Sequence, residues 1–144
     1  MPVQRMVHAR PRILVAGTEL AIAACQRILG EEAQVVAARS VAEALERLEP
    51  APDLIISSVR FDESRMFDFL QQLRERCSSP VVCCRIVPKP LSPAIYQSIE
   101  TAAAALGVKA FMDMHTEIRR HGADEAERRL RSLIHAHLPV RAVT

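Results

Sequence analysis

The sequence predicts one α/β domain, a doubly wound parallel sheet of five strands with five helices on its two faces. Three observations lead to this fold class. Short apolar runs alternate along the chain with longer segments whose apolar residues recur at helical spacing. The short runs are apolar at successive positions, which is typical of strands that helices cover on both faces. A length of 144 residues suits one domain, which would bury about two-thirds of its unfolded surface.

Five short segments predict the strands, which are residues 12–16, 34–38, 53–58, 81–84 and 108–114. The first strand ends at Gly17 and Thr18, where a turn into a helix is expected. The fourth strand is followed by Pro88 and Pro90, which have no backbone N–H to donate and therefore end the strand pairing.

Five apolar stripes at helical spacing predict the helices, which include residues 20–28, 41–48, 66–73, 95–106 and 126–137. Three of these helices have clear start signals. Thr18 and Ser40 carry hydroxyls that can cap a helix, and Ser40 forms a capping box with Glu43. Ser92 is a cap residue that Pro93 follows at the first helical position, where a missing N–H does no harm.

Composition and charge exclude several classes of function. Apolar residues make up 49% of the chain but aromatic residues only 3%, so we expect a core of aliphatic side chains and alanine. The net charge of +2 is slight, and arginines are mixed with acidic residues, which argues against a surface for nucleic acid or an anionic membrane. No apolar run approaches the roughly 20 residues that span a bilayer, and residues 1–12 lack the apolar stretch of a secretory signal. We therefore expect a cytoplasmic protein that binds neither nucleic acid nor membranes directly.

The four cysteines form no recognisable ligand or redox motif. Cys25, Cys77, Cys83 and Cys84 have spacings that match neither a zinc site nor a Cys-x-x-Cys pair. In a reducing compartment such residues are most simply small members of the core. The sequence thus predicts no metal site and no cofactor.

Five segments, taken in order, resemble those of a known family. Residues 12–16 resemble its first strand, 52–56 its phosphorylation strand, and 66–74 its third helix. Residues 79–82 resemble the lead into its fourth strand, and 107–111 its fifth strand. The family is the receiver domain of two-component response regulators, and the order and spacing of the five segments carry the resemblance.

The resemblance to receiver domains covers about residues 12–138 of the chain. It implies a strand order of 2-1-3-4-5 in the predicted sheet. Residues 1–11 are then an irregular leader, and residues 139–144 are a tail or the start of a linker.

In receiver domains the active site lies beyond the carboxyl ends of four strands, where Mg²⁺ assists transfer of a phosphoryl group to one aspartate. The resemblance places Ser58 at the aspartate position and Gly17 and Thr18 at the paired acids that hold Mg²⁺. It places Arg85 at the hydroxyl residue that closes over the phosphate and Met114 at the lysine of the fifth strand. A serine without a base or metal is a poor nucleophile, and this set offers no carboxylate for a hard cation. The resemblance therefore implies a pseudo-receiver, which is not an enzyme and acts without phosphoryl transfer.

A second interpretation stays open for the same edge of the sheet. Hydroxyls, backbone N–H groups and a guanidinium can together bind an anion. The candidates for this vacated pocket are Gly17, Thr18, Ser57, Ser58, Arg85 and Met114. In this case the protein would be a sensor of a small, nucleotide-like anionic effector. Alternatively, Arg85 fills the space itself by pairing with Glu19 or by capping carbonyl groups.

The predicted helix after Ser92 and the fifth strand form the surface through which receiver domains commonly dimerise or bind partners. This helix is rich in alanine, so another helix could approach it closely. The candidate contact residues are Tyr96, Ile99, Ala103, Phe111 and Met112. Phe111 also matches the aromatic position whose rotamer reports activation in the family, and a plain core role is the simpler alternative. We therefore predict a homodimer or another protein partner, in bacterial signal transduction or transcriptional regulation.

Overall fold

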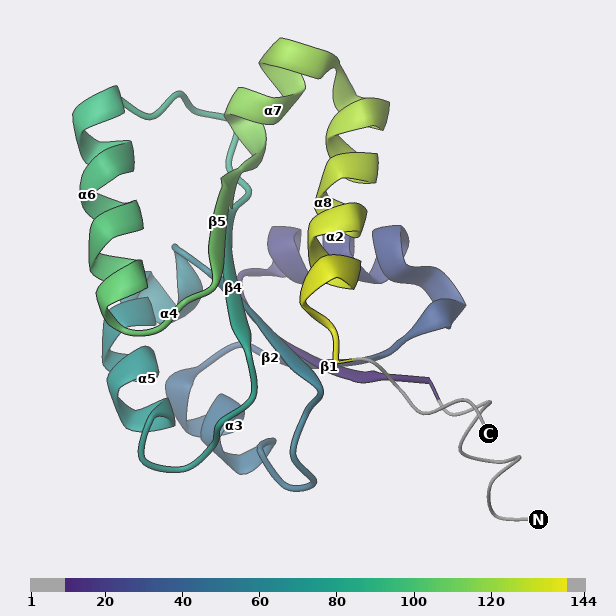
Figure 1. Cartoon of the computed structure of the whole chain (residues 1–144), viewed down its shortest axis with the longest axis vertical. Coiled ribbons are helices and arrows are strands. Elements are labelled where there is room, and N and C mark those ends of the chain that lie inside the picture. The colour runs from purple at the N-terminus through teal and green to yellow at the C-terminus, as the bar shows by residue number, and fades with distance from the viewer. Residues whose placement is uncertain (1–9, 140–144) are drawn as a thin grey trace.

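The computed structural model describes residues 10–139 and contains a five-stranded sheet in the order β2-β1-β3-β4-β5 (Figure 1). Every neighbouring pair of strands is parallel. The predicted fold class and strand order are therefore confirmed. The predicted leader and tail fall outside the described residues, apart from Arg10, Pro11 and Pro139. The strands are β1 (Arg12–Ala16), β2 (Gln34–Ala38), β3 (Leu54–Ser58), β4 (Val81–Arg85) and β5 (Ala110–Asp113).

Residues 10–139 contain seven α-helices and one short 3-10 helix, where five helices were predicted. The difference arises because the chain forms two helices rather than one after β3, and again after β5. Gly122 has a φ of 85°, a left-handed conformation that ends one helix and allows the next to begin. No helix in this part of the chain is long and apolar enough to cross a membrane. The helices are α2 (Glu19–Leu29), η1 (Gly30–Glu32), α3 (Val41–Glu46), α4 (Phe61–Ser64), α5 (Met66–Leu73), α6 (Pro93–Ala105), α7 (Met114–His121) and α8 (Ala123–His137).

Each face of the sheet has its own core, because successive strand residues alternate between the two faces. Leu14 and Ile55 pack with residues of α3, α5 and α6 on one face. Ile13 and Ile56 pack with residues of α2 and α8 on the other face. Figure 1 shows the same arrangement, with the sheet between these two groups of helices. β1, β3 and β4 are thus strands buried on both faces, as predicted, whereas the edge strands β2 and β5 are partly buried.

The predicted starts of the first two helices are confirmed by their hydrogen bonds. Thr18 Oγ1 accepts a hydrogen bond of 3.3 Å from the N–H of Ala21 at the start of α2. Ser40 Oγ accepts one of 3.1 Å from the N–H of Glu43. The carboxylate of Glu43 reaches back and accepts from the N–H of Arg39 at 2.7 Å, one residue before the expected partner.

The connection after β3 contains three successive non-glycine residues with positive φ. They are Asp62, Glu63 and Ser64, with φ values of 48°, 56° and 69°. A left-handed backbone is costly for residues that carry a Cβ, so neighbouring contacts must hold it in place. Asp62 supplies one such contact, because its carboxylate accepts a hydrogen bond of 2.8 Å from the N–H of Val41. This contact joins the loop after β3 to the start of α3.

Candidate functional site

The carboxyl ends of β1, β3, β4 and β5 lie together at one edge of the sheet, where ligand sites of such folds occur. The pairing register sets Ser58 beside Cys84 and Arg85 beside Asp113. Gly17 follows β1 at the same edge, where its N–H donates to the carbonyl of Ala38 at 3.0 Å. Candidate residues from separate strands thus lie at one edge of the sheet, and their contacts determine which ligands this edge could bind.

Gly17 packs closely against Ala21 and Ser58, and a side chain at Gly17 would be tightly crowded. A Cβ atom at Gly17 would lie 3.1 Å from the Cβ of Ala21 and 3.3 Å from the Cβ of Ser58. Glycine therefore allows the turn after β1 to approach the end of β3 closely. Ser58 is buried, and its Oγ accepts a hydrogen bond of 3.3 Å from the N–H of Arg60. The hydroxyl of Ser58, which the resemblance predicts to stand at the aspartate position, thus contributes to the loop that follows β3.

This edge of the sheet does not fit the magnesium ion that receiver chemistry requires. Hard divalent cations prefer several carboxylate or carbonyl oxygens. Gly17, Thr18 and Ser58 provide no carboxylate, and Gly17 and Ser58 are in close contact. Glu19 forms a salt bridge with Arg39 instead, and the hydrogen bond from Arg39 lowers the pKa of Glu19. Among residues 10–139, no three His, Cys, Asp or Glu side chains are grouped so that they could hold a metal ion.

Arg85 lies at this edge of the sheet and forms an ion pair with Asp113. Arg85 Nη1 donates to Asp113 Oδ1 at 2.8 Å, and the two side chains are 7% and 0% exposed. The other carboxylate oxygen of Asp113 accepts a hydrogen bond of 2.7 Å from Thr116 Oγ1. The buried charges therefore neutralise each other, and both carboxylate oxygens are hydrogen-bonded. Glu19, the partner that the sequence suggested for Arg85, forms a salt bridge with Arg39 instead.

Asp113 was not among the predicted site residues, although its place in the sequence indicates a buried acid that needs a partner. Asp113 is an acid within the apolar segment 108–114. A carboxylate in a strand that is buried on both faces requires a cationic partner. Arg85 ends the neighbouring strand in the order 2-1-3-4-5, so the two residues could have been matched from topology.

Ser57 lies on the same face of the sheet as the Arg85–Asp113 pair but is not hydrogen-bonded to it, and Met114 lies on the other face. Ser57 faces the layer of α3, α5 and α6, and its Oγ is buried without a hydrogen-bond partner in the described part of the chain. Met114 packs in the core under α2 and α8, where it begins α7 rather than ending β5 as predicted. The vacated-pocket candidates are therefore distributed over both faces of the sheet rather than around one cavity.

Three of the five candidate contact residues share one surface. Tyr96 of α6 and Phe111 of β5 are in ring contact, with centroids 5.0 Å apart and an interplanar angle of 48°. Ile99 lies one turn after Tyr96 and is partly exposed. Ala103 is 1% exposed and packs in the core, so it is not available to a partner. Met112 lies on the opposite face of β5, beside α8.

Burial makes three of the cysteines poor nucleophiles. It raises the pKa of Cys25 and Cys83 to about 12, and it raises the pKa of Cys84 well above the usual value. The thiolate is the reactive form of cysteine, so these side chains act as small core residues.

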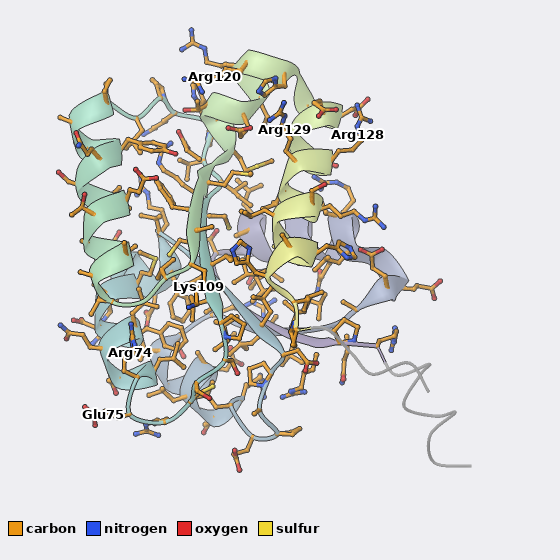
Figure 2. All side chains as sticks on the ribbon, in the orientation of Figure 1. Arg74, Glu75, Lys109, Arg120, Arg128 and Arg129 are labelled. Atoms are coloured by element: carbon orange, nitrogen blue, oxygen red, sulfur yellow. The ribbon has the colours of Figure 1, made fainter. Side chains whose placement is uncertain are left out.

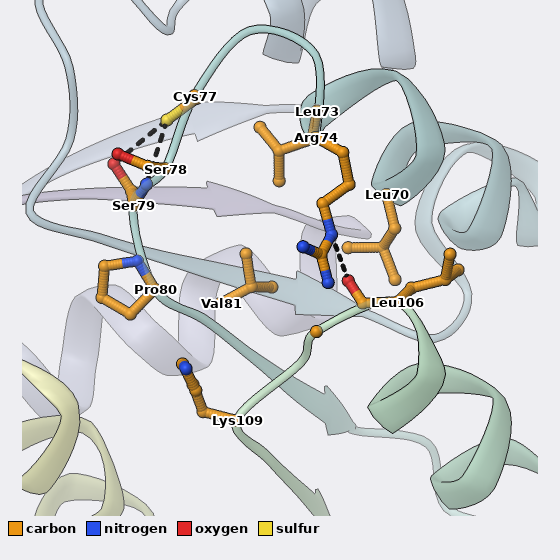
Figure 3. Close-up of a pocket in the computed structure, with 11 residues that line it drawn as sticks. Leu70, Leu73, Arg74, Cys77, Ser78, Ser79, Pro80, Val81, Leu106 and Lys109 are labelled. Atoms are coloured by element: carbon orange, nitrogen blue, oxygen red, sulfur yellow. Dashed lines mark hydrogen bonds between the residues drawn. The ribbon is translucent and has the colours of Figure 1, made fainter.

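A small pocket of about 230 Å³ lies at the opposite edge of the sheet, between α5, the start of β4 and the turn after α6 (Figure 3). Arg74 extends across it and donates from Nε to the carbonyl of Leu106 at 2.6 Å. The Cys77 thiol donates to Ser79 Oγ at 3.1 Å. These polar groups hold the surrounding loops together, and the pocket lies away from the edge where ligands of such sheets bind.

No protein-family model matches the sequence, and no curated protein matches it. Solved structures match at low sequence identity. The BeF3-activated N-terminal receiver domain of RstA from Klebsiella pneumoniae is 14% identical and has a TM-score of 0.66, and the match covers 90% of this chain and 98% of that chain. The chain has the receiver fold.

Two further response regulators show the same receiver fold. The chemotaxis response regulator CheY4 of Vibrio cholerae is 17% identical with a TM-score of 0.63, and the match covers 88% of this chain and 98% of that chain. A response regulator from Thermotoga maritima is 16% identical with a TM-score of 0.61, and the match covers 88% and 99%. At these identities the likeness concerns the fold, so function has to be argued from the site.

Proposed function

We propose that this chain is a pseudo-receiver, a receiver fold that regulates through protein contacts and does not transfer phosphoryl groups. The observation that carries this proposal is the Arg85–Asp113 pair. It occupies the edge of the sheet at which receiver domains hold their phosphorylation chemistry, and it ties the ends of β4 and β5 together. Because this ion pair holds the edge in one arrangement, the fold presents the same surface to a partner without a phosphate signal.

The surroundings of Ser58 support the same proposal. Its Oγ accepts a hydrogen bond from the backbone of Arg60, and no base in residues 10–139 is hydrogen-bonded to it. A serine hydroxyl needs an adjacent base or a metal to act as a nucleophile. A phosphate at Arg85 would lie beside the buried carboxylate of Asp113, whose negative charge disfavours a second anion. We therefore assign the protein no enzymatic activity.

The second candidate, a sensor of a nucleotide-like anion at Arg85, has less support. The guanidinium of Arg85 is buried and engaged by Asp113, and Gly17 and Ser58 are in close contact beside β1 and β3. An anion at this position would lie beside the carboxylate of Asp113, which repels it. Thermal-shift screening of nucleotides checks this candidate, and a pseudo-receiver should give no hit that depends on Arg85.

The proposed partner surface is formed by the exposed parts of Ile95, Tyr96 and Ile99 of α6 together with Phe111. Ala103 is the one buried residue of α6, so most of the helix surface remains outside the core. Ile95 is 53% exposed, and Tyr96 and Ile99 are partly exposed. Apolar side chains on an alanine-rich helix suit the approach of a second helix. We therefore propose a homodimer, or a complex with another signalling protein, through this surface.

The setting of this regulation follows from the fold. The structural neighbours are response regulators and receiver domains, which supports a role in bacterial signal transduction or transcriptional regulation. This role is proposed by analogy with proteins of the same fold.

Two experiments test the proposal. Incubation with acetyl phosphate and Mg²⁺ should leave the intact mass unchanged, and a phosphorylated species would contradict it. Sedimentation velocity over a concentration series should show a dimer that Ile99→Glu dissociates. Ala23→Glu, which places the same charge on the exposed side of α2, should leave the dimer intact. A wild-type protein that stays monomeric at every concentration would contradict the homodimer.

A further inference from the structure

An apolar groove of about 520 Å³ lies at the carboxyl edge of the sheet. It is formed by the start of α2, the loop that follows β4, and α7. These segments directly follow β1, Arg85 and Asp113 in the chain. The apolar side chains that line the groove are Leu20, Ile86, Val87, Pro88, Met114 and Ile118.

The walls of the groove include two large apolar side chains that are exposed to water. Leu20 is 53% exposed and Ile118 is 45% exposed, whereas Met114 is 4% exposed and also belongs to the core. Leaving such side chains in water forgoes the free energy that their burial would contribute. A concave apolar site within roughly 300–1,000 Å³ is typical of small-molecule binding.

One end of the groove carries positive charge. His115 and Arg119 line the groove, and both also line a neighbouring hollow of about 330 Å³ that includes Arg120. Arg119 and Arg120 are exposed and form no ion pair with any residue from 10 to 139. The nearest acid on the same helix, Glu117, lies 4.0 Å from His121. The guanidinium of Arg119 therefore adjoins the apolar surface, and that of Arg120 lies at the neighbouring hollow.

The acid at the other end of the groove does not oppose this charge. Glu19 precedes Leu20 at the start of α2 and forms a salt bridge with Arg39. The groove thus combines an apolar floor and walls with one cationic end, which matches a ligand that has an apolar body and one anionic group.

We propose that this groove binds a small amphipathic carboxylate. Its aliphatic or aromatic body packs against Leu20, Ile86 and Ile118, and its carboxylate lies at Arg119, beside the hollow that contains Arg120. The site differs from the vacated pocket predicted at Arg85, because it uses side chains of α7 and of the loop after β4. It is also separate from the proposed partner surface on α6, so it stands or falls independently of the pseudo-receiver proposal.

The test is a titration of octanoate, octylamine and acetate into protein with ¹³C-labelled methyl groups. Octanoate, kept below its micelle concentration, should give saturable shifts at the methyl groups of Leu20, Ile86 and Ile118. Acetate lacks the apolar body and octylamine carries the opposite charge, so both should bind at least about tenfold more weakly.

Variants separate the apolar and the ionic parts of the site. Ile118→Asp should abolish octanoate binding, and the double variant Arg119→Gln/Arg120→Gln should weaken it by about tenfold. Lys109→Gln is the matched control, since Figure 2 shows Lys109 and Arg120 at opposite ends of β5. This control should bind octanoate like the wild type.

Three results would overturn the proposal. They are equal affinity for octanoate and octylamine, shifts confined to residues outside the groove, and no saturable shift with any of the three probes. If an acidic amphipathic peptide shifts the same methyl groups while octanoate does not, the groove is a peptide-docking surface and the proposal is also wrong. The melting temperature of each variant confirms that it is folded before its binding is compared.

Discussion

Arg85 and Asp113 form a buried ion pair that joins the carboxyl ends of β4 and β5, with 2.8 Å between Nη1 and Oδ1. Thr116 donates to the second carboxylate oxygen of Asp113. A charge that is removed from water is stable only with a partner, so each residue depends on the other. The pair therefore fixes the end of the edge strand at the place where other receiver folds carry out their chemistry.

The first prediction concerns the loss of one member of this pair. Asp113→Ala should lower the free energy of unfolding by about 3–5 kcal/mol, because it leaves the buried guanidinium of Arg85 without a counter-ion. Urea denaturation measures the change.

The matched control replaces both charges at once. The double variant Arg85→Met/Asp113→Leu should recover most of the lost stability, because an apolar pair avoids the desolvation of two ions. Additive losses in the two single variants and the double variant would show that the residues are not coupled, contrary to the structure.

The second prediction concerns the buried hydroxyl of Ser57. Its Oγ has no hydrogen-bond partner among the described residues, so Ser57→Ala should leave stability unchanged or raise it by about 1 kcal/mol. Ser58→Ala is the companion variant. It removes the acceptor for the N–H of Arg60 and should lower stability by about 1 kcal/mol. Thermal unfolding compares the two, and a larger loss for Ser57→Ala would contradict the assignment.

The third prediction concerns the contact between Gly17 and Ser58. Gly17→Ala should destabilise the fold by about 1–3 kcal/mol, because the added Cβ meets the side chains of Ala21 and Ser58. Ala23→Ser is the control, because it adds one heavy atom at an exposed position of α2. The control should cost little, and equal melting temperatures for the two variants would refute the close contact.

The fourth prediction concerns pH. Glu32 of η1 lies 2.6 Å from Arg131 and 2.8 Å from His135, both on α8. The hydrogen bond from Arg131, assisted by that from His135, lowers the pKa of Glu32 from 4.5 to about 2. A carboxyl whose pKa is lower in the folded state adds stability above its unfolded pKa, and this stability is lost as the pH falls through its folded pKa.

Glu32→Gln should therefore be less stable than the wild type at neutral pH, by about 1 kcal/mol after allowance for solvent screening. The difference should shrink between pH 4.5 and about 2 as Glu32 takes up a proton in the wild type. Urea denaturation at a series of pH values measures it. High salt should reduce the difference at neutral pH, and a gap that stays constant down to about pH 2 would disprove this role of Glu32.

The scaffold could be predicted from the sequence because its signals are local. The strands at 12–16 and 34–38 have the predicted bounds, since continuous apolar runs can be buried only between two layers of helices. Thr18 and Ser40 start their helices as expected, because a cap depends on residues within one turn.

Other features could not be predicted because they depend on tertiary contacts. The left-handed turn at 62–64 contains no glycine that would mark it, and Asp62 holds it through Val41. The buried side of α6 was misjudged at Ala103, because alanine occurs around the whole helix and leaves its inward face unspecified. The partner of Arg85 cannot be read from a local pattern alone, because it also requires the order of β4 and β5 in the sheet.

The most direct test of the central claim is the amide NMR spectrum of the protein with beryllofluoride and Mg²⁺. A pseudo-receiver closed by the Arg85–Asp113 pair should give the same spectrum with and without these ions. The receiver domain of RstA, prepared in parallel, serves as the positive control, since it has been obtained in a BeF3-activated form. Saturable shifts at Gly17, Ser58 and Arg85 would contradict the account.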